Sequence, residues 1–272
     1  MNFIYDNDWL NREPPYAFKW DHLLIIFLFI SIGVLAAFLL KKKSKRTIKI
    51  VLISLWAFYV SLQIFYYTVI YIRSFNNPSE YPFNIETMLP LHSCLMFMYV
   101  FPFAMFSKNK YVKTAACNFL VIVNMIMGFI TLFVGCPAAG CSALSFFGLQ
   151  TLIYHALDVV VPLIMLITGY YDIQKNDVKY GLIVFGLLSI TVYTFDAITG
   201  ADYFYFYDGH NFPVFDFISK NVPHIVWTLI VLSCYIITAF ATHYAVIGIK
   251  YLANKNKKAP VEEPDEPVQE QQ

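Results

Sequence analysis

The sequence predicts an all-α, polytopic membrane helix bundle with seven transmembrane helices, and two observations support this. First, 58% of the 272 residues are hydrophobic and the mean hydropathy is +0.57, far above that of a soluble domain. Second, apolar runs of about 18 residues or more recur along the chain, and each is long enough to cross a hydrocarbon core. Such runs must be helical, because only a helix satisfies its own backbone polar groups in lipid.

The apolar runs and the Pro, Asn and Gly residues between them divide the chain. A polar and aromatic stretch at 200–221 separates the last two runs, and the opening residues lack the positive charge of a signal peptide. Residues 1–250 are therefore predicted to form one transmembrane domain, and 251–272 a charged, disordered cytoplasmic tail. The predicted helices are 22–40, 49–72, 88–106, 112–134, 146–169, 180–199 and 222–249.

The distribution of Lys and Arg predicts the orientation. Fifteen of the 19 lie in three alternate connections and the tail, at 41–49, 108–113, 175–179 and 250–258. The positive-inside rule then places the N-terminus outside the cell membrane and the C-terminus in the cytoplasm. Because the basic residues flank apolar runs, they do not form a nucleic-acid surface.

Ionisable side chains inside these apolar runs are the candidate functional residues, since such groups are costly in a membrane and usually mark function. The predicted directions of the helices place six of them in the outer half of the bundle: His92, Cys94, His155, Asp158, Asp196 and His224. No zinc motif or phosphate-binding glycine loop is present, so we expect no cofactor and no metal.

Helical spacing indicates how some of these residues pair. His155 and Asp158 are three residues apart and share a face, which suits a general base oriented by a carboxylate, although such a pair can also serve packing alone. His92 and Cys94 are two apart and point to nearly opposite faces of a regular helix. If Cys94 is a nucleophile, a base from another helix, His155 or His224, fits better; the alternative is a small buried hydrophobe.

Other polar residues form stripes along the predicted helices. Asn124 shares a stripe with Cys117 and Gly128, and Tyr193 shares one with Asp196. We assign His224, Asp196, Asn124 and Tyr193 to substrate binding. His243 is predicted to lie at the membrane interface, and no broken helix is visible in the sequence. Cys136 and Cys141 flank a short outer loop, and whether they form a disulfide is left open.

One motif resembles a known family. Leu89-Pro90-Leu91-His92-Ser93-Cys94 is similar to the Leu-Pro-Leu-His-Leu-Cys signature of the bacterial YwaF-type membrane proteins, relatives of the transmembrane protein 164 acyltransferases. Weaker similarities occur at 18–22, 154–162 and 196–204. The resemblance implies acyl transfer on membrane phospholipids, with Cys94 as nucleophile and His92 beside it. This chain has Asp196 and Asp202 where the family has two Asn residues.

These observations leave three classes of function. The first is acyl transfer, in which Cys94 attacks an ester, His155 oriented by Asp158 is the base, and His92 and His224 polarise the carbonyl or bind the head group. The second is transport of a small molecule or proton through the same cluster. The third is a receptor-like protein with a purely structural polar core. Protein partners are not indicated by the sequence.

Overall fold

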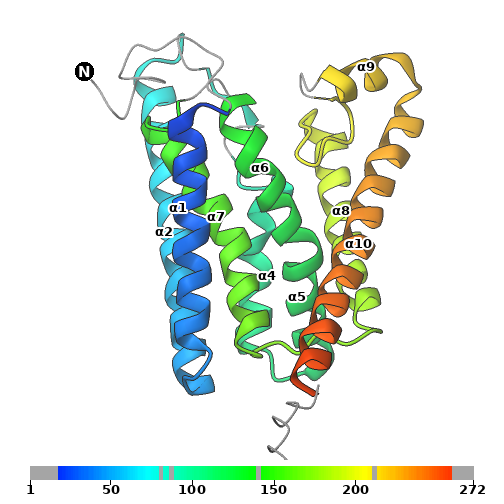
Figure 1. Ribbon diagram of the computed structural model, residues 1–272. Coiled ribbons are helices and arrows are strands. Elements are labelled where there is room, and N and C mark those ends of the chain that lie inside the picture. Colours follow the sequence, from blue (N-terminus) through cyan, green and yellow to red (C-terminus); the bar gives the residue numbers. More distant parts are fainter. Residues whose placement is uncertain (1–17, 80–81, 86–88, 139–141, 210–212, 259–272) are drawn as a thin grey trace, which may run out of the picture.

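The computed structural model describes residues 18–79, 82–85, 89–138, 142–209 and 213–258, and every regular element in these ranges is a helix (Figure 1). In chain order they are α1 (Trp20–Leu40), α2 (Lys45–Asn76), η1 (Ser93–Leu95), α4 (Met96–Phe106), α5 (Lys110–Phe119), η2 (Leu120–Asn124), α6 (Met125–Ala138), α7 (Phe146–Ile167), α8 (Val178–Thr199), α9 (Pro213–Asn221) and α10 (His224–Lys258).

Six of the described helices are long and apolar enough to cross a membrane, which confirms a multi-pass helical bundle. α1, α2, α7 and α8 lie within four residues of their predicted bounds. The continuous helix α5–η2–α6 accounts for the predicted helix at 112–134. α10 extends past its predicted end at 249, and α9 lies within the stretch that was predicted to be a connection.

The third predicted helix, 88–106, differs from the prediction. Only Ser93–Phe106 is helical among its described residues, about 21 Å at about 1.5 Å per residue, which is too short to cross the membrane alone. Pro90 explains the late start, because it lacks an N–H group and keeps the preceding residue out of the helical region. The prediction of an unbroken helix here was wrong, and the helix begins inside the bundle.

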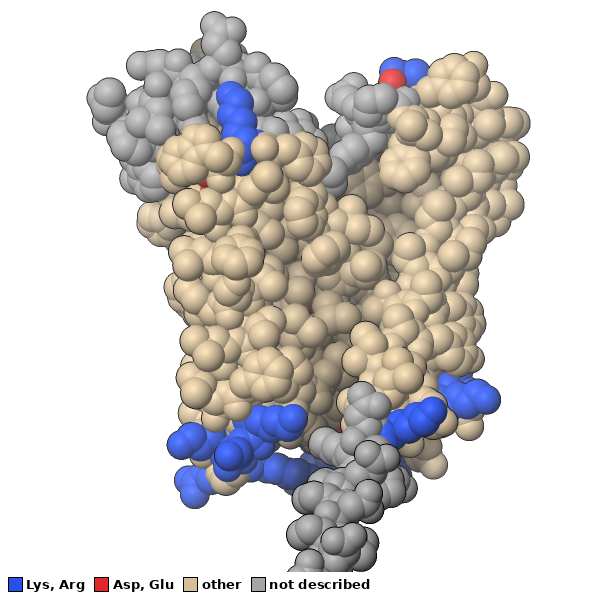
Figure 2. All heavy atoms as spheres, in the orientation of Figure 1, with Lys and Arg blue, Asp and Glu red and all other residues tan. Residues whose placement is uncertain are grey.

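The helices form two parts that diverge toward one end. α1, α2 and α7 pack on one side with α6, whereas α8 and α10 lie on the other side, with α9 across their ends (Figure 1). α8 packs on α5, and α10 packs on η2. Figure 2 shows the surface hollowed between the two parts at the α9 end.

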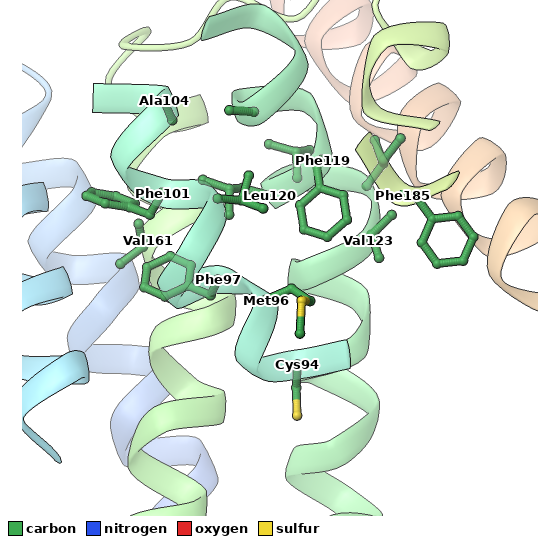
Figure 3. Packing of buried hydrophobic residues seen from close by; sticks show 14 of the residues in the cluster. Cys94, Met96, Phe97, Phe101, Ala104, Phe119, Leu120, Val123, Val161 and Phe185 are labelled. Carbon is green, nitrogen blue, oxygen red and sulfur yellow. The ribbon is translucent and has the colours of Figure 1, made fainter. Parts of the chain in front are cut away.

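α4 lies at the centre of the main hydrophobic core. Phe97 and Phe101 of α4 pack with Phe119 and Leu120 of the α5–η2 helix, and all four side chains are buried (Figure 3). Residues 93–97 are all buried, so this core holds the start of the short helix deep within the protein, whereas Phe103 and Phe106 further along it are exposed.

Positive charge gathers at the end of the bundle opposite α9, where Figure 2 shows most of the lysines and arginines. This end contains the α1–α2 connection, the start of α5, the start of α8 and the C-terminal part of α10. The middle of the surface carries no such charge in this view, as expected for a face in contact with lipid.

Close packing of α1 on α7 gives a test of this arrangement. A Cβ atom at Gly33 would lie 2.2 Å from Cγ2 of Val160, whereas one at Gly186 of α8 would meet no atom within 4 Å. We expect Gly33→Ala to destabilise the protein by about 1–3 kcal/mol through overpacking. Gly186→Ala, the matched control, should stabilise it by about 0.5–1 kcal/mol through helix propensity. Thermal unfolding in detergent measures both, and equal midpoints for the two variants would contradict the α1–α7 packing.

Candidate functional site

Cys94 lies in η1, at the point where the third helix starts inside the bundle. Its backbone carbonyl accepts hydrogen bonds from Asn124 Nδ2 at 3.3 Å and from the Tyr59 hydroxyl at 3.5 Å. Both donors are fully buried. Irregular backbone at membrane depth is stable only where protein groups satisfy it, and these two side chains do so. Asn124, which was assigned to substrate binding, therefore holds the backbone of Cys94.

The position of Asn124 depends on an irregularity in its own helix. It is the last residue of η2, a π-helical turn in which every residue is buried. π-Turns rotate the following side chains relative to a regular helix and often occur at functional sites. The sequence gives no local signal for this turn, so the contact of Asn124 with Cys94 is visible only in the structure.

The Cys94 thiol is 9% exposed, and Figure 3 shows its sulfur pointing away from α4 and the packed core. The backbone N–H of Cys94 and the Tyr154 hydroxyl lie near this sulfur.

His155 and Asp158 form a pair beside this turn. His155 Nδ1 lies 3.3 Å from Asp158 Oδ2, and both side chains are almost fully buried. This confirms that the two residues share one face of the helix. Neither ring nitrogen and neither carboxylate oxygen makes a well-directed hydrogen bond to the described residues. Asn124 and Tyr59, the two donors to the Cys94 carbonyl, also approach Asp158. These two side chains therefore link Cys94 to the His155–Asp158 pair.

Gly128 of α6 lets α7 approach closely at the pair. A Cβ atom there would lie 2.5 Å from Asp158 Cβ and 3.0 Å from the His155 carbonyl oxygen. Any side chain at this position would push α7 and its two ionisable residues away from η2. Packing therefore holds the pair in place despite the lack of direct hydrogen bonds.

His92 immediately precedes η1 and has an extended backbone, with ψ 148°. The prediction that it lies in the first turn of a regular helix was wrong, so the expected opposite facing of His92 and Cys94 does not apply. His92 Nδ1 lies 3.3 Å from the Tyr203 carbonyl oxygen, and the two rings are 4.9 Å apart. Since a carbonyl only accepts, Nδ1 carries the proton. His92 is also in electrostatic range of His155.

Residues 201–207 leave α8 and fold inward against this site. Ala201, Tyr203, Phe204 and Phe206 are all buried. Tyr205 has a φ of +61°, a conformation that costs a bulky residue about 1–3 kcal/mol and often marks a functional position. Its carbonyl accepts from Trp227 Nε1 at 3.0 Å, and its side chain is in electrostatic range of Cys94. The prediction of a simple connection at 200–221 missed the inward fold of this segment, for which aromatic richness and the family similarity at 196–204 were the signals.

Asp196 and Asp202 hold the inward segment in shape. Asp196 Oδ2 accepts from the backbone N–H of Tyr203 at 3.1 Å. Asp202 Oδ2 accepts from the N–H groups of Tyr207 and Asp208 at 3.1 Å and 2.8 Å. The carboxylates therefore stabilise backbone turns, a role that the amide oxygen of Asn also fulfils.

His224 and Tyr193 lie away from Cys94. His224 is exposed at the start of α10, and its ring stacks on Tyr207 at 4.3 Å between centroids. The Tyr193 ring belongs to the same group and lies 5.8 Å from Tyr207 and 6.4 Å from His224 between centroids. The residues predicted as one cluster thus separate into a buried group around Cys94 and a surface stack on the α8–α10 part.

Two other histidines serve the fold. The His22 ring accepts from the Phe18 N–H at 3.1 Å and donates to the Leu132 carbonyl at 2.8 Å, which ties the start of α1 to α6. His243 is fully buried, and its ring nitrogens contact Asn118 and the Lys175 carbonyl at 3.4 Å and 3.2 Å. α10 turns this face toward α5 and the α7–α8 connection, and the interfacial depth of His243 stays a prediction.

Across the described residues, no group of three or more His, Cys, Asp or Glu side chains is arranged to hold a metal ion. Cys94, Cys117 and Cys234 are free thiols. Cys141 and the side chain of Cys136 lie outside the described residues, so the disulfide stays a prediction.

The roles of Asp196 and Asp202 lead to a prediction. Asp196→Asn and Asp202→Asn should leave the thermal midpoint close to that of the unchanged protein, because an amide oxygen still accepts from the backbone N–H groups. Asp196→Ala and Asp202→Ala should each destabilise the protein by about 1–3 kcal/mol, since buried N–H groups lose their acceptors. Thermal unfolding of the four variants measures this, and Asn variants as unstable as the Ala variants would contradict the capping role.

Comparison with known proteins gives one match. The model of the TMEM164 family matches residues 17–247, from just before α1 to within α10. No curated protein and no solved structure matches the chain.

Proposed function

Because the chain belongs to the TMEM164 family, we propose that it is a membrane-embedded acyltransferase that moves phospholipid acyl chains through Cys94. One observation carries this proposal most directly. A cysteine lies at the N-terminus of a helix that starts inside the bundle, in electrostatic range of Asp158 in the buried His155–Asp158 pair. A nucleophilic thiol needs a base to take its proton, and we assign this role to His155.

In the proposed reaction, Cys94 Sγ adds to the carbonyl carbon of a phospholipid ester, and the thiol proton passes to His155. The bond between the carbonyl carbon and the glycerol oxygen then breaks, and His155 returns the proton to that oxygen. The products are an acyl-thioester on Cys94 and a lysophospholipid. A hydroxyl group of a second lipid attacks the thioester carbonyl carbon and gives its proton to His155. The carbon–sulfur bond then breaks, the new ester is released, and His155 returns the proton to Cys94 Sγ.

Asp158 orients the imidazole of His155 from the Nδ1 side, where its carboxylate lies 3.3 Å away. His92, whose Nδ1 contacts the Tyr203 carbonyl, is in electrostatic range of His155. We assign His92 to proton exchange with His155. The burial of these groups favours a lipid acceptor over hydrolysis, because water is largely excluded from the thiol.

We further propose a seven-crossing topology with the N-terminus outside and the C-terminus in the cytoplasm of the cell membrane. The described residues 89–92 and the short helix α4 would belong to the third crossing. The gathering of Lys and Arg at the end opposite α9 supports this orientation (Figure 2), because positive residues are retained on the cytoplasmic side.

Replacement of the nucleophile tests the proposed function. Expression of the unchanged protein should alter the acyl-chain profile of cellular phospholipids relative to an empty vector, and Cys94→Ala should return the profile to that of the vector. Cys234→Ala is the matched control, since Cys234 is an exposed thiol on α10, and it should act as the unchanged protein does. Lipid mass spectrometry provides the measurement. A Cys94→Ala profile equal to that of the unchanged protein would rule out the nucleophile.

The structure also favours a second candidate, binding or transport of a small polar molecule or proton. No broken helix was expected from the sequence, yet α4 begins in mid-bundle, and broken helices form the substrate sites of many transporters. The neighbouring Asp158 carboxylate is buried, as in intramembrane proton carriers.

Two substitutions separate these functions. If the protein is a transporter, Asp158→Asn should abolish proton-coupled uptake into vesicles, while Cys94→Ala leaves uptake intact. If it is an acyltransferase, Cys94→Ala should abolish lipid transfer and neither variant should change proton flux. Proton-flux assays on reconstituted vesicles, run beside the lipid assay, distinguish the two outcomes.

A further inference from the structure

Two hydrogen-bond donors beside the Cys94 sulfur have no role in the steps above. One is the backbone N–H of Cys94, and the other is the hydroxyl group of Tyr154. Cys94 is the second residue of η1, and the first N–H groups of a helix have no acceptor within the helix. The next N–H, that of Leu95, differs because it donates to the His92 carbonyl at 2.8 Å.

Packing fixes the position of Tyr154. Its ring lies 4.0 Å from the ring of His155 between centroids, and it meets the Tyr59 ring edge-on at 5.9 Å. Tyr59 in turn donates to the Cys94 carbonyl. Tyr154 is therefore held between His155 and Tyr59, and its hydroxyl lies near the Cys94 sulfur.

The two tyrosines have different roles. The Tyr59 hydroxyl donates to the buried carbonyl of Cys94, which needs a hydrogen-bond partner, so Tyr59 stabilises η1. Among the described residues, no backbone carbonyl accepts from the Tyr154 hydroxyl, so this group is available to a substrate. A phenol that faces the sulfur also faces any carbonyl group that binds to it.

We propose that the Tyr154 hydroxyl and the Cys94 backbone N–H bind the oxyanion that forms when the thiol adds to a phospholipid ester. This inference rests on the proposed acyl transfer. As the carbon–sulfur bond forms, the π electrons of the carbonyl move to its oxygen, where the two donors hold the negative charge. When the intermediate collapses, these electrons restore the double bond and the bond to the glycerol oxygen breaks.

Burial makes these donors effective. Fixed donors in a site without water stabilise a developing charge more than water does, because they need no reorganisation during the reaction. The surrounding residues belong to the hydrophobic core, and the Cys94 side chain is 9% exposed. The half-buried Tyr154 lies at the edge of this core and is thus a catalytic residue that the sequence analysis did not single out.

The test compares Tyr154→Phe with Tyr244→Phe, an exposed tyrosine on α10 far along the chain from η1. Each purified full-length protein is reconstituted in nanodiscs that contain a phospholipid with a labelled acyl chain and an unlabelled lysophospholipid. Transfer of label is then followed per folded molecule. Tyr154→Phe should lower kcat by about 10²-fold to 10³-fold with little change in KM, the usual effect of removing one oxyanion donor. Tyr244→Phe should match the unchanged protein.

Two outcomes would overturn the inference in different ways. If the unchanged protein transfers label and Tyr154→Phe transfers it equally fast, Tyr154 does not bind the oxyanion, but the proposed function stands. If the unchanged protein transfers no label, the proposed function fails and this inference fails with it. A rise in KM with kcat unchanged would show that Tyr154 binds the substrate and not the transition state, which also overturns the proposal.

Discussion

Two hydrogen bonds to the carbonyl oxygen of Cys94 allow a helix to begin in the middle of this bundle. They come from Asn124 and Tyr59, on two different helices. A buried carbonyl without partners costs about 1–3 kcal/mol, and in a membrane interior no water is available to reduce that cost. The π-turn η2 positions one of the donors, so an irregularity in one helix supports the break in another.

The break at η1 determines the other features of the site. It exposes N–H groups next to a thiol, in a region where an unbroken helix would have none. It also leaves His92 outside the helix, where the carbonyl of Tyr203 fixes the position of its proton. The inward segment 201–207 supplies that carbonyl, and Asp196 and Asp202 hold the segment through its backbone N–H groups. Side chains thus hold the irregular backbone at both places, from two other helices at Cys94 and from nearby residues in the inward segment.

The parts that follow from local sequence were predictable. The long helices follow from the length of their apolar runs, and the His155–Asp158 contact follows from a spacing of three residues on one helix. The break at η1 was not predicted, because the composition of an apolar run does not show whether the whole run or only half of it is helical. Pro90 was a local signal, but only the surrounding core decides whether the freed backbone can be satisfied.

Contacts between distant residues were beyond sequence reasoning. His92 and Tyr203 are 111 positions apart, and Asn124 and Cys94 are 30 apart on different helices. The burial of His243 depends on contacts with α5 and the α7–α8 connection. The sequence analysis grouped His224 with Cys94 because both were predicted at a similar depth in the membrane. In the structure, the His224 ring stacks on Tyr207 in the part of the bundle formed by α8 and α10. Equal depth is therefore a weak predictor of contact in a bundle whose two parts diverge.

The central claim is that Cys94 carries an acyl group during the reaction. Intact-protein mass spectrometry after incubation with phospholipid vesicles tests it most directly. The account predicts an added fatty-acyl mass that neutral hydroxylamine removes and that Cys94→Ala lacks. An acyl mass that persists in Cys94→Ala, or lipid transfer by the unchanged protein without any hydroxylamine-sensitive adduct, would contradict it.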